Sequence, residues 1–369
     1  MSAREVVVVG AGIVGAATAR ELAVRGVDVL LLDAGDVSSG TTGLGEGNVL
    51  CSDKEAGPEL ELTLRGLELY DEIEEELGEQ ARIRRKGALI AHPDAATWAA
   101  EPERVERLRE AGVEAELVAA EAVRELEPAL TGTVYGASLF PRDLQCAPRA
   151  ITRALARAAG DVRTGARVHS VSGRGVVLET GERIAAGAVI LAAGVWTAPL
   201  AEGAGLTLPV EPRKGQLVQL RGEAPIRHKV IDGSYLASVL SDDAGLQVTT
   251  IVETTWDGDV LVGSSRERRG FDTSVDEAVS AAMVERAARL FPGLPALPRT
   301  AAWAGLRPWL PDNLPAIGPS RAVDGLWVAT GHEGAGVALG PVTGRLVAQA
   351  YCGEPTLVEL GPFDPDRFS

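Results

Sequence analysis

The stretch EVVVVGAGIVGAATARELAVRGVDVLLLD, residues 5–33, decides the fold that this sequence predicts. A β-branched run meets the motif Gly10-x-Gly12-x-x-Gly15, which opens an alanine-rich helix, and a second apolar run ends at Asp33. Such a turn lets backbone approach a dinucleotide pyrophosphate and points the positive end of the helix dipole at it. An acid about 20 residues further on can bond a ribose. The stretch therefore predicts a Rossmann-type βαβ unit.

The far end of the chain repeats this order of elements. LWVATGHEGAGVALGPVTGRLVAQAY, residues 326–351, gives a strand, a glycine loop and a helix, while the middle of the chain suits a separate antiparallel layer. We therefore expect an α/β fold in which a discontinuous Rossmann-type domain carries an antiparallel-sheet α+β substrate domain. The nucleotide-binding domain would comprise residues 1–80, 143–210 and 300–369, and the substrate domain residues 81–142 and 211–299.

Hydrophobic periodicity predicts the elements between the two ends. Helices are expected at residues 58–78, 147–159 and 276–290, with charged helical segments over 101–127. Strands are expected at residues 83–91, 167–171, 175–179, 186–197, 215–221, 246–253 and 259–264.

Composition restricts the class of protein. The 369 residues carry a formal net charge of −16, which would repel nucleic acid. No apolar run reaches the roughly 18 residues of a membrane span. The N-terminus enters the first strand at once, so we expect no secretory signal and a cytoplasmic protein.

The metal-ligating residue types are sparse. Cys51, Cys146 and Cys352 lie far apart without C-x-x-C spacing, so reduced structural thiols are expected. The four histidines form no close pair, and no metal site is expected.

Six segments in order resemble the family of flavoproteins that contains glycine oxidase, sarcosine oxidase and D-amino acid oxidase or dehydrogenase, and the glycine oxidase branch is the most similar. They are VVVVGAGIVGAATARELAVRG at the start, SSGTTGLGEGN at 38–48, VILAAGVWT at 189–197, VLVGSSRE at 260–267, WAGLRPWLPDNLPAIGP at 303–319 and VATGHEGAGVALGP at 328–341. The resemblance covers essentially the whole chain. It implies that the nucleotide-binding domain is of the GR2-like FAD-binding type and that the cofactor is FAD.

The resemblance also implies the FAD-binding residues. The first glycine motif and Asp33 would hold the ADP half, Thr41 and Thr42 would reach the pyrophosphate and ribityl chain, and Val168 would contact the adenine through its backbone. The residues implied are Gly10, Gly12, Ile13, Val14, Gly15, Asp33, Ala34, Thr41, Thr42, Gly45, Glu46, Gly47, Asn48, Val168, Ala193, Gly194, Trp196, Arg307, Gly331, His332, Glu333, Gly334, Ala335, Gly336 and Val337.

The glycine loop at 331–337 has two interpretations. Taken alone, it fits a tight turn that packs a strand against a helix. Beside the other motifs, we expect its N–H groups and the following helix N-terminus to face the flavin N1–C2=O edge, where reduction places negative charge.

Five residues are candidates for the reaction site. Arg307 is the expected anchor of the substrate carboxylate, because a planar guanidinium matches that group and the arginine of this motif has that role in the family. The alternative is a structural arginine paired with an acid at a domain interface. Glu46 and Glu333 could accept a hydrogen bond from the substrate amine or from backbone. His332 could bond flavin or substrate or be satisfied within the fold, and Tyr235 could line the pocket.

Three further residues, Lys54, Thr249 and Arg266, could line the second domain's side of the pocket or be ordinary strand and loop residues. The sequence departs from the family at Gly334, where glycine oxidase has a second arginine. That change removes a positive charge and leaves space. We therefore expect a substrate larger than glycine: an N-substituted glycine, another secondary amino acid or a D-amino acid.

The attachment of the flavin also follows from the resemblance. Some family members bind flavin through a cysteine just before the arginine, but here Ala304, Gly305 and Leu306 stand there, so noncovalent FAD is expected.

The leading hypothesis is an FAD-dependent amino acid oxidase, whose imine product hydrolyses and whose flavin is reoxidised by O2. Its partners would be the amino acid and either O2 or an electron-accepting protein. A second copy of the chain is a further candidate partner, in a homo-oligomer. The first alternative is the FAD subunit of a dehydrogenase complex, similar to those of hydrogen cyanide synthase or hydroxyproline dehydrogenase. A non-catalytic flavin-binding subunit is disfavoured by the presence of Arg307. A nicotinamide dehydrogenase fits the first motif alone and is disfavoured by the C-terminal loop.

Overall fold

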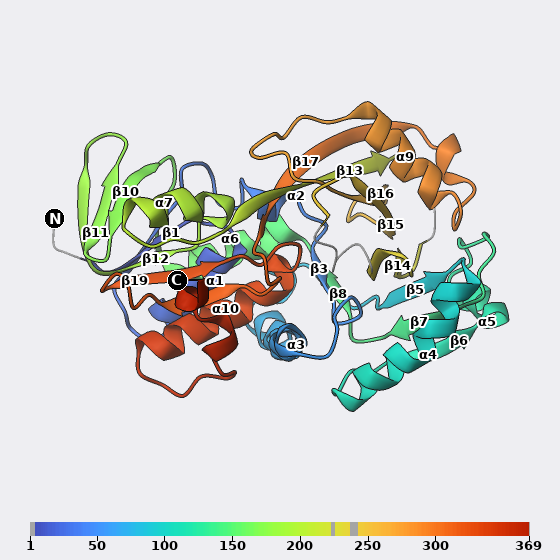
Figure 1. Cartoon of the computed structure of the whole chain (residues 1–369), viewed down its shortest axis with the longest axis horizontal. Coiled ribbons are helices and arrows are strands. Elements are labelled where there is room, and N and C mark those ends of the chain that lie inside the picture. The colour runs from blue at the N-terminus through green and yellow to red at the C-terminus, as the bar shows by residue number, and fades with distance from the viewer. Residues whose placement is uncertain (1–3, 223–225, 237–242, 369) are drawn as a thin grey trace.

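The computed structural model describes residues 4–222, 226–236 and 243–368, which form two large sheets and one small sheet (Figure 1). The helices are α1 (Ile13–Ala23), α2 (Thr41–Leu44), α3 (Pro58–Leu77), α4 (Ala95–Glu110), α5 (Ala120–Leu126), α6 (Pro148–Ala159), α7 (Thr197–Gly203), α9 (Glu277–Ala287) and α10 (Gly336–Tyr351). Short 3-10 helices are η1 (Gly78–Gln80), η2 (Gly194–Trp196), η3 (Leu294–Ala296), η4 (Gly361–Phe363) and η5 (Pro365–Phe368).

The first sheet joins strands from both ends of the chain. It contains β1 (Arg4–Val9), β2 (Val29–Leu32), β9 (Asp161–Arg163), β10 (Val168–Ser172), β11 (Gly175–Leu178), β12 (Arg183–Leu191), β18 (Ala316–Pro319) and β19 (Leu326–Thr330). Its centre is parallel, in the order β19–β12–β1–β2–β9, and β10, β11 and β18 add antiparallel edges. This arrangement confirms the predicted Rossmann-type sheet.

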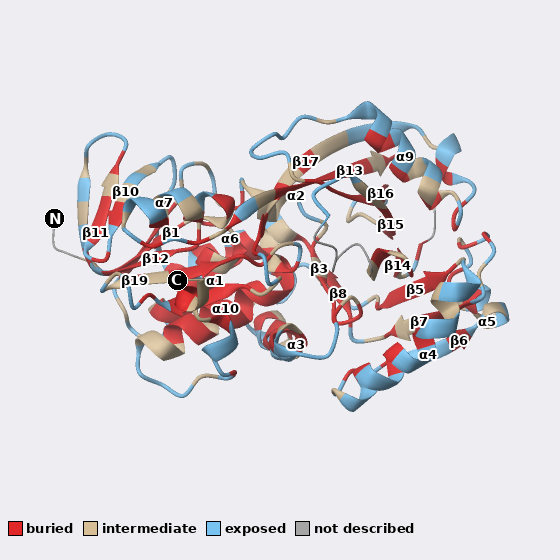
Figure 2. Ribbon diagram, viewed as in Figure 1, coloured by how far each residue is buried: buried red, intermediate tan, exposed pale blue. Residues whose placement is uncertain are grey.

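Strand β1 is buried on both faces, as expected for a parallel strand covered by helices. Val6 and Val8 belong to the apolar cluster that includes α1, α3, α6 and α10, whereas Val7 and Val9 belong to the cluster under α7. Figure 2 shows α1 and α10 largely buried, while the outer faces of α4 and α5 are exposed.

The second sheet is mainly antiparallel. It runs β17 (Arg299–Trp309), β13 (Glu211–Leu220), β16 (Val260–Arg266), β15 (Gln247–Thr254), β14 (Lys229–Asp232), β5 (Ala88–His92), β7 (Gly136–Phe140) and β6 (Glu116–Ala119). Only the β14–β5 pair in this sheet is parallel among the described residues. The small sheet, β3 (Asn48–Val49), β8 (Leu144–Cys146) and β4 (Ile83–Arg84), lies between the large sheets in Figure 1.

Some element predictions were wrong. The strand expected at 83–91 is two strands: β4 ends at Arg84, and Gly87, with a φ of +68°, immediately precedes β5. The segment 101–127 holds strand β6 between two helices. Strand β17 was not predicted, and it pairs along its length with β13, so the proposed domain boundary at residue 300 crosses a sheet. The division into two domains therefore remains a proposal, and β17 belongs by pairing with the second sheet.

Helix α1 packs against α6 and α10 at very short range. A Cβ at Gly344 of α10 would stand 2.6 Å from the carbonyl carbon of Ala17. A Cβ at Gly15 would stand 1.8 Å from the carbonyl oxygen of Gly10. Glycine at these two positions lets the N-terminus of α1 and the helix α10 share one end of the first sheet.

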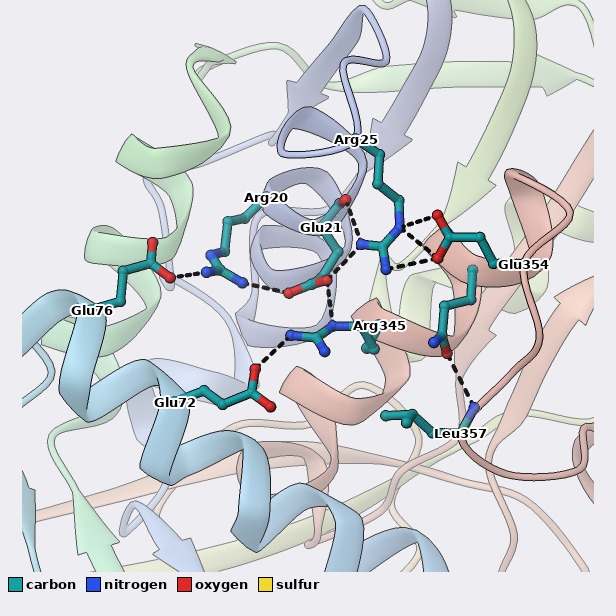
Figure 3. Close-up of polar contacts among 9 residues, drawn as sticks. Arg20, Glu21, Arg25, Glu72, Glu76, Arg345, Glu354 and Leu357 are labelled. Carbon is teal, nitrogen blue, oxygen red and sulfur yellow. Dashed lines mark hydrogen bonds and ion pairs between the residues drawn. The ribbon is translucent and has the colours of Figure 1, made fainter.

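A buried glutamate reinforces this contact (Figure 3). Glu21 on α1 accepts hydrogen bonds from Arg25 at 2.8 Å and from Arg345 of α10 at 2.6 Å, and it also pairs with Arg20. Arg345 continues to Glu72 of α3 at 2.9 Å. These ion pairs connect the C-terminal end of α1 with α3 and with the middle of α10.

No helix among the described residues is long and apolar enough to cross a bilayer. The described residues also contain no group of three His, Cys, Asp or Glu side chains placed to hold a metal ion.

We predict that Gly344→Ala lowers the free energy of unfolding by about 1–3 kcal/mol, because the new methyl overlaps the α1 backbone. Gly203→Ala in α7 is the matched control, since no atom from outside its own stretch of helix lies within 4 Å of the Cβ position there. Urea denaturation of both variants checks this. A Gly344→Ala protein as stable as the parent would contradict the packing described.

Candidate functional site

A cavity of about 630 Å³ lies between the two large sheets, within the usual size range of cofactor and ligand sites. Most residues implied by the resemblance line it. They are Gly10, Gly12, Ile13, Val14, Asp33, Ala34, Thr41, Thr42, Gly45, Glu46, Gly47, Asn48, Val168, Ala193, Gly194, Trp196, Arg307, His332, Glu333, Gly334, Gly336 and Val337, together with Tyr235.

Three of the implied residues do not line this cavity. Gly15 packs on the carbonyl of Gly10, as described above. Gly331 has a φ of +84°, and a Cβ there would overlap Leu310. Ala335 lines a neighbouring cavity of about 60 Å³, with Lys54. These three residues shape the loops around the cavity.

The first glycine loop closes one end of the cavity. Gly12 precedes α1 without any side-chain cap, and Ile13 N–H donates to Thr42 Oγ1 at 3.1 Å. The Asp33 carboxylate accepts Ala11 N–H and Gly35 N–H, each at 2.7 Å. Asp33 therefore holds the loop itself, and its remaining lone pairs leave room for the ribose bond that the motif predicts.

The backbone here has the form that a dinucleotide needs. A Cβ at Gly10 would lie 2.5 Å from the carbonyl oxygen of Ala192, and one at Gly12 would lie 3.1 Å from Thr42 Oγ1. Side chains at these positions would occupy the space that the loop leaves at the N-terminus of α1. The residues present therefore fit the pyrophosphate of FAD.

The second glycine loop reaches the same cavity from α10. Ala335 precedes α10 without a side-chain cap, and Gly336 and Val337 of its first turn line the cavity. Glu333 has a φ of +44°, a conformation rare for a residue with a side chain. Two helix N-termini, neither of which is capped by the side chain of its own N-cap residue, thus face one cavity and favour negative charge in it.

Three arginines meet at the carboxylate of Glu333. Arg213, Arg266 and Arg307 each have a guanidinium nitrogen within 4 Å of Glu333 Oε1, at 3.8, 3.7 and 3.9 Å. Burial alone would raise the pKa of Glu333, but Arg266, Arg307 and Arg213 outweigh it and hold the pKa below its usual value. Glu333 is therefore ionised at neutral pH.

Arg307 itself is a strand residue at the cavity wall. It lies on β17 opposite Arg213 of β13, and its Nη1 donates to the carbonyl oxygen of Ser265 at 3.0 Å. Burial lowers its pKa, though a guanidinium stays protonated at neutral pH. The Arg307 side chain is thus near an acid, as the interpretation of Arg307 as a structural arginine predicts. It also lines the cavity, as the anchor role requires.

His332 and Tyr235 have partners in the fold. His332 Nε2 lies 2.9 Å from Thr343 Oγ1 of α10, and burial lowers the histidine pKa to about 3, so the ring is neutral. The Tyr235 hydroxyl accepts a hydrogen bond from Arg266 Nη2 at 2.8 Å. Thr249 donates to the carbonyl oxygen of Ser264 at 3.0 Å and lines neither cavity.

Sequence reasoning missed two cations of the site, Arg213 and Lys229. Both are almost wholly buried, and strand pairing between distant segments brings them behind the cavity wall, where Arg213 pairs with Glu333 and Lys229 pairs with Glu46. No local motif marks them among the 36 lysines and arginines of the chain.

The comparisons with known proteins agree with this geometry. The family model described as FAD dependent oxidoreductase (DAO) matches residues 5–350. The chain belongs to this family. It is 30% identical to glycine oxidase of Pseudomonas aeruginosa, over 98% of each chain.

Solved structures give the same assignment. Glycine oxidase from Geobacillus kaustophilus superimposes with a TM-score of 0.89 at 28% identity, over 100% of this chain and 99% of that chain. L-proline dehydrogenase from P. horikoshii also gives a TM-score of 0.89, at 26% identity, over 100% and 98% of the two chains. The resemblance inferred from the motifs is confirmed, and with it FAD as the cofactor and amino acid oxidation as the general activity.

We predict that FAD is bound without a covalent link. Cys51 and Cys146 are buried, Cys352 is exposed, and none of the three lines the cavity. Acid precipitation should leave the yellow colour in the supernatant. Colour that remains in the washed pellet would contradict the prediction.

Proposed function

We propose that this enzyme oxidises the C–N bond of a small amino acid to an imine, which hydrolyses in solution, and that O2 reoxidises the cofactor. Bound FAD supplies the two-electron acceptor for the substrate C–H bond. The observation that carries the proposal is that Arg307 lines the same cavity as the two glycine loops, beside Gly334, which places no side chain there.

Arg307 would hold the substrate carboxylate. Its guanidinium is buried, so a bond between it and a carboxylate competes little with water and is charge-assisted. The planar fork also fixes the orientation of the carboxylate, and hence of the adjacent carbon. Positioning of this kind is a large part of what a flavoprotein contributes to its cofactor's chemistry.

The space beside Gly334 supports a substrate larger than glycine. A Cβ at Gly334 would be 3.8 Å from the nearest atoms, Cδ and Nε of Arg307, so a small group fits there without displacing protein atoms. We propose an N-substituted glycine, another secondary amino acid or a D-amino acid as the substrate class.

One observation favours a second candidate function. The structural similarity to L-proline dehydrogenase equals that to glycine oxidase, with a TM-score of 0.89 for both. A dehydrogenase that passes electrons to another protein or a quinone therefore stays as the alternative. Hydrogen peroxide release by the isolated chain during turnover distinguishes the oxidase from this alternative. Failure of every amine to reduce the bound flavin would instead indicate a non-catalytic subunit.

We also propose that the protein is cytoplasmic, with a homo-oligomer as one candidate state of assembly.

Replacement of the anchor gives the first test. Arg307→Met should lower kcat/KM for amino acids by about 100-fold or more, because it removes one partner of a buried charge pair. Arg299→Met, at the exposed start of the same strand, should leave kcat/KM unchanged. Arg307→Met with parental kcat/KM would rule out the anchor role.

A substrate series gives the second test. Glycine, N-methylglycine, longer N-alkylglycines and D-proline should be compared by kcat/KM, with glycine expected to be a poor substrate. Gly334→Arg should fill the open space and reduce kcat/KM for N-alkylglycines more than for glycine. If glycine proved clearly the best substrate of the parent enzyme, the proposed substrate class would be wrong.

A further inference from the structure

Four charged side chains that are mostly shielded from water form a line that ends at the cavity, and we call them the ion chain: Lys86, Glu253, Lys229 and Glu46. Lys229 Nζ lies 2.5 Å from Glu46 Oε2 and 3.4 Å from Glu253 Oε1. Lys86 pairs with the other oxygen of Glu253. The side chains of Lys86, Glu253, Lys229 and Glu46 are 12%, 0%, 1% and 8% exposed. Only Glu46 among them lines the cavity.

Strand pairing fixes the position of the ion chain. Lys229 begins β14, which pairs with β15, the strand that carries Glu253. Lys229 is also opposite Ala88 at the start of β5, two residues after Lys86. Glu46 comes from a different part of the fold, the segment just before β3. The second sheet therefore holds a cation against a carboxylate that belongs to the cavity wall.

Such a chain is a poor way to stabilise a protein. Removing an ionised group from water costs several kcal/mol, and a buried ion pair often contributes less than apolar residues of the same volume. A buried ion pair can, however, keep a carboxylate ionised and hold it in a fixed position. Both hydrogen bonds that hold Glu46, from Lys229 and from Asn48, go to Oε2.

The charge state of Glu46 follows from its surroundings. Burial alone would raise its pKa, but Lys229, the Asn48 hydrogen bond and Arg307 outweigh it and lower the pKa below its usual value. Burial likewise lowers the pKa of Lys229, but Glu253, Glu46 and Tyr235 more than reverse this effect. At the outer end, burial lowers the pKa of Lys86, although Glu253 opposes it. Glu46 therefore carries a negative charge at neutral pH.

The cavity thus presents Glu46 as an anion beside the cationic Arg307, while the other carboxylate of its lining, Glu333, is paired with three arginines. Glu46 stands close enough to Arg307 for each to shift the pKa of the other. A zwitterionic amino acid has the matching pair of charges, separated by one carbon atom. A binding site with one cationic and one anionic side chain fixes the orientation of that carbon atom. An arginine alone fixes only the carboxylate.

We propose that Glu46 is the ammonium-binding residue of the site and that Lys229 is the positioning residue that keeps Glu46 ionised and in place. The inference rests on the proposed amino acid oxidation and adds to it how the amine is recognised. The ammonium N–H donates to Glu46 while the carboxylate accepts from Arg307. The class of ligand is therefore the amino acid zwitterion, in preference to a simple carboxylic acid or amine.

The test measures binding of two probes to the FAD-loaded enzyme. Anaerobic reduction by N-methylglycine gives its Kd and limiting rate, and the shift in flavin absorbance on titration with acetate gives a Kd for a carboxylate without an amine. Glu46→Gln should raise the Kd of N-methylglycine roughly 10- to 100-fold, the effect of losing a hydrogen bond between charged groups. The Kd of acetate should stay unchanged.

Lys229→Met tests the positioning role. Without its counter-ion, Glu46 should have a raised pKa and be protonated at neutral pH. The Kd of N-methylglycine should then rise at neutral pH and recover as the pH increases through that raised pKa, below the pKa of the amine itself. In the parent enzyme, whose Glu46 has a lowered pKa, no such recovery should occur over the same range.

Three further variants complete the design. Lys229→Arg retains the charge and should retain the parental Kd, which also keeps the proposal testable if Lys229→Met fails to fold. The double variant Glu46→Gln/Lys229→Met should bind N-methylglycine no more weakly than Glu46→Gln. Arg104→Met is the matched control, because it removes a buried cation that pairs with Glu101 at 2.7 Å outside the cavity.

The outcomes separate the two proposals. If no amino acid reduces the parent flavin, the proposed function fails and the inference fails with it. If N-methylglycine reduces the parent enzyme and Glu46→Gln binds it equally well, the function stands and the ammonium site is wrong. If Glu46→Gln weakens acetate and N-methylglycine alike, or only weakens FAD, Glu46 holds the cofactor or the fold and the inference is overturned.

Discussion

Helix α1 approaches Gly10, in the turn after β1, and helix α10 so closely that side-chain carbons have no room at Gly15 and Gly344. This steric constraint determines where both glycine loops end. It places the uncapped N-terminus of α1 and that of α10 at one cavity, although the two helices lie more than 300 residues apart in the chain. The Glu21 ion pairs join the C-terminal end of α1 to the middle of α10, next to Gly344 (Figure 3). The positive ends of two helix dipoles then favour the phosphates and the reduced flavin.

The second sheet supplies the opposite wall, and its contribution is mainly buried charge. Arg307, Arg266 and Arg213 surround Glu333, and Lys229 holds Glu46. Charges taken out of water interact strongly with one another and with a ligand, but each costs desolvation energy. Their concentration at one cavity is therefore better explained by ligand recognition than by stability. Gly334, in the loop before α10, lines the cavity beside Arg307 without a side chain.

Local patterns predicted what depends on local structure. The strand–turn–helix at the first glycine motif and the final strand–loop–helix were correct because turn geometry and helix periodicity are encoded within a few residues. Strand β17 was missed, since its segment contains glycine and proline and was recognised only as a motif. The roles of Arg213 and Lys229 could not be predicted, because β13–β17 and β14–β5 pairing brings them to the site. Glu46 was identified, but its dependence on Lys229, 183 residues away, was not.

The central claim is that Arg307 binds the substrate carboxylate inside the cavity that holds FAD. A crystal structure of the FAD-loaded protein with an unreactive carboxylic acid tests it most directly. The account predicts a carboxylate hydrogen-bonded to the Arg307 guanidinium, with the rest of the acid in the space beside Gly334. A carboxylate bound elsewhere, with Arg307 still bonded only to Ser265 and facing Glu333, would contradict it.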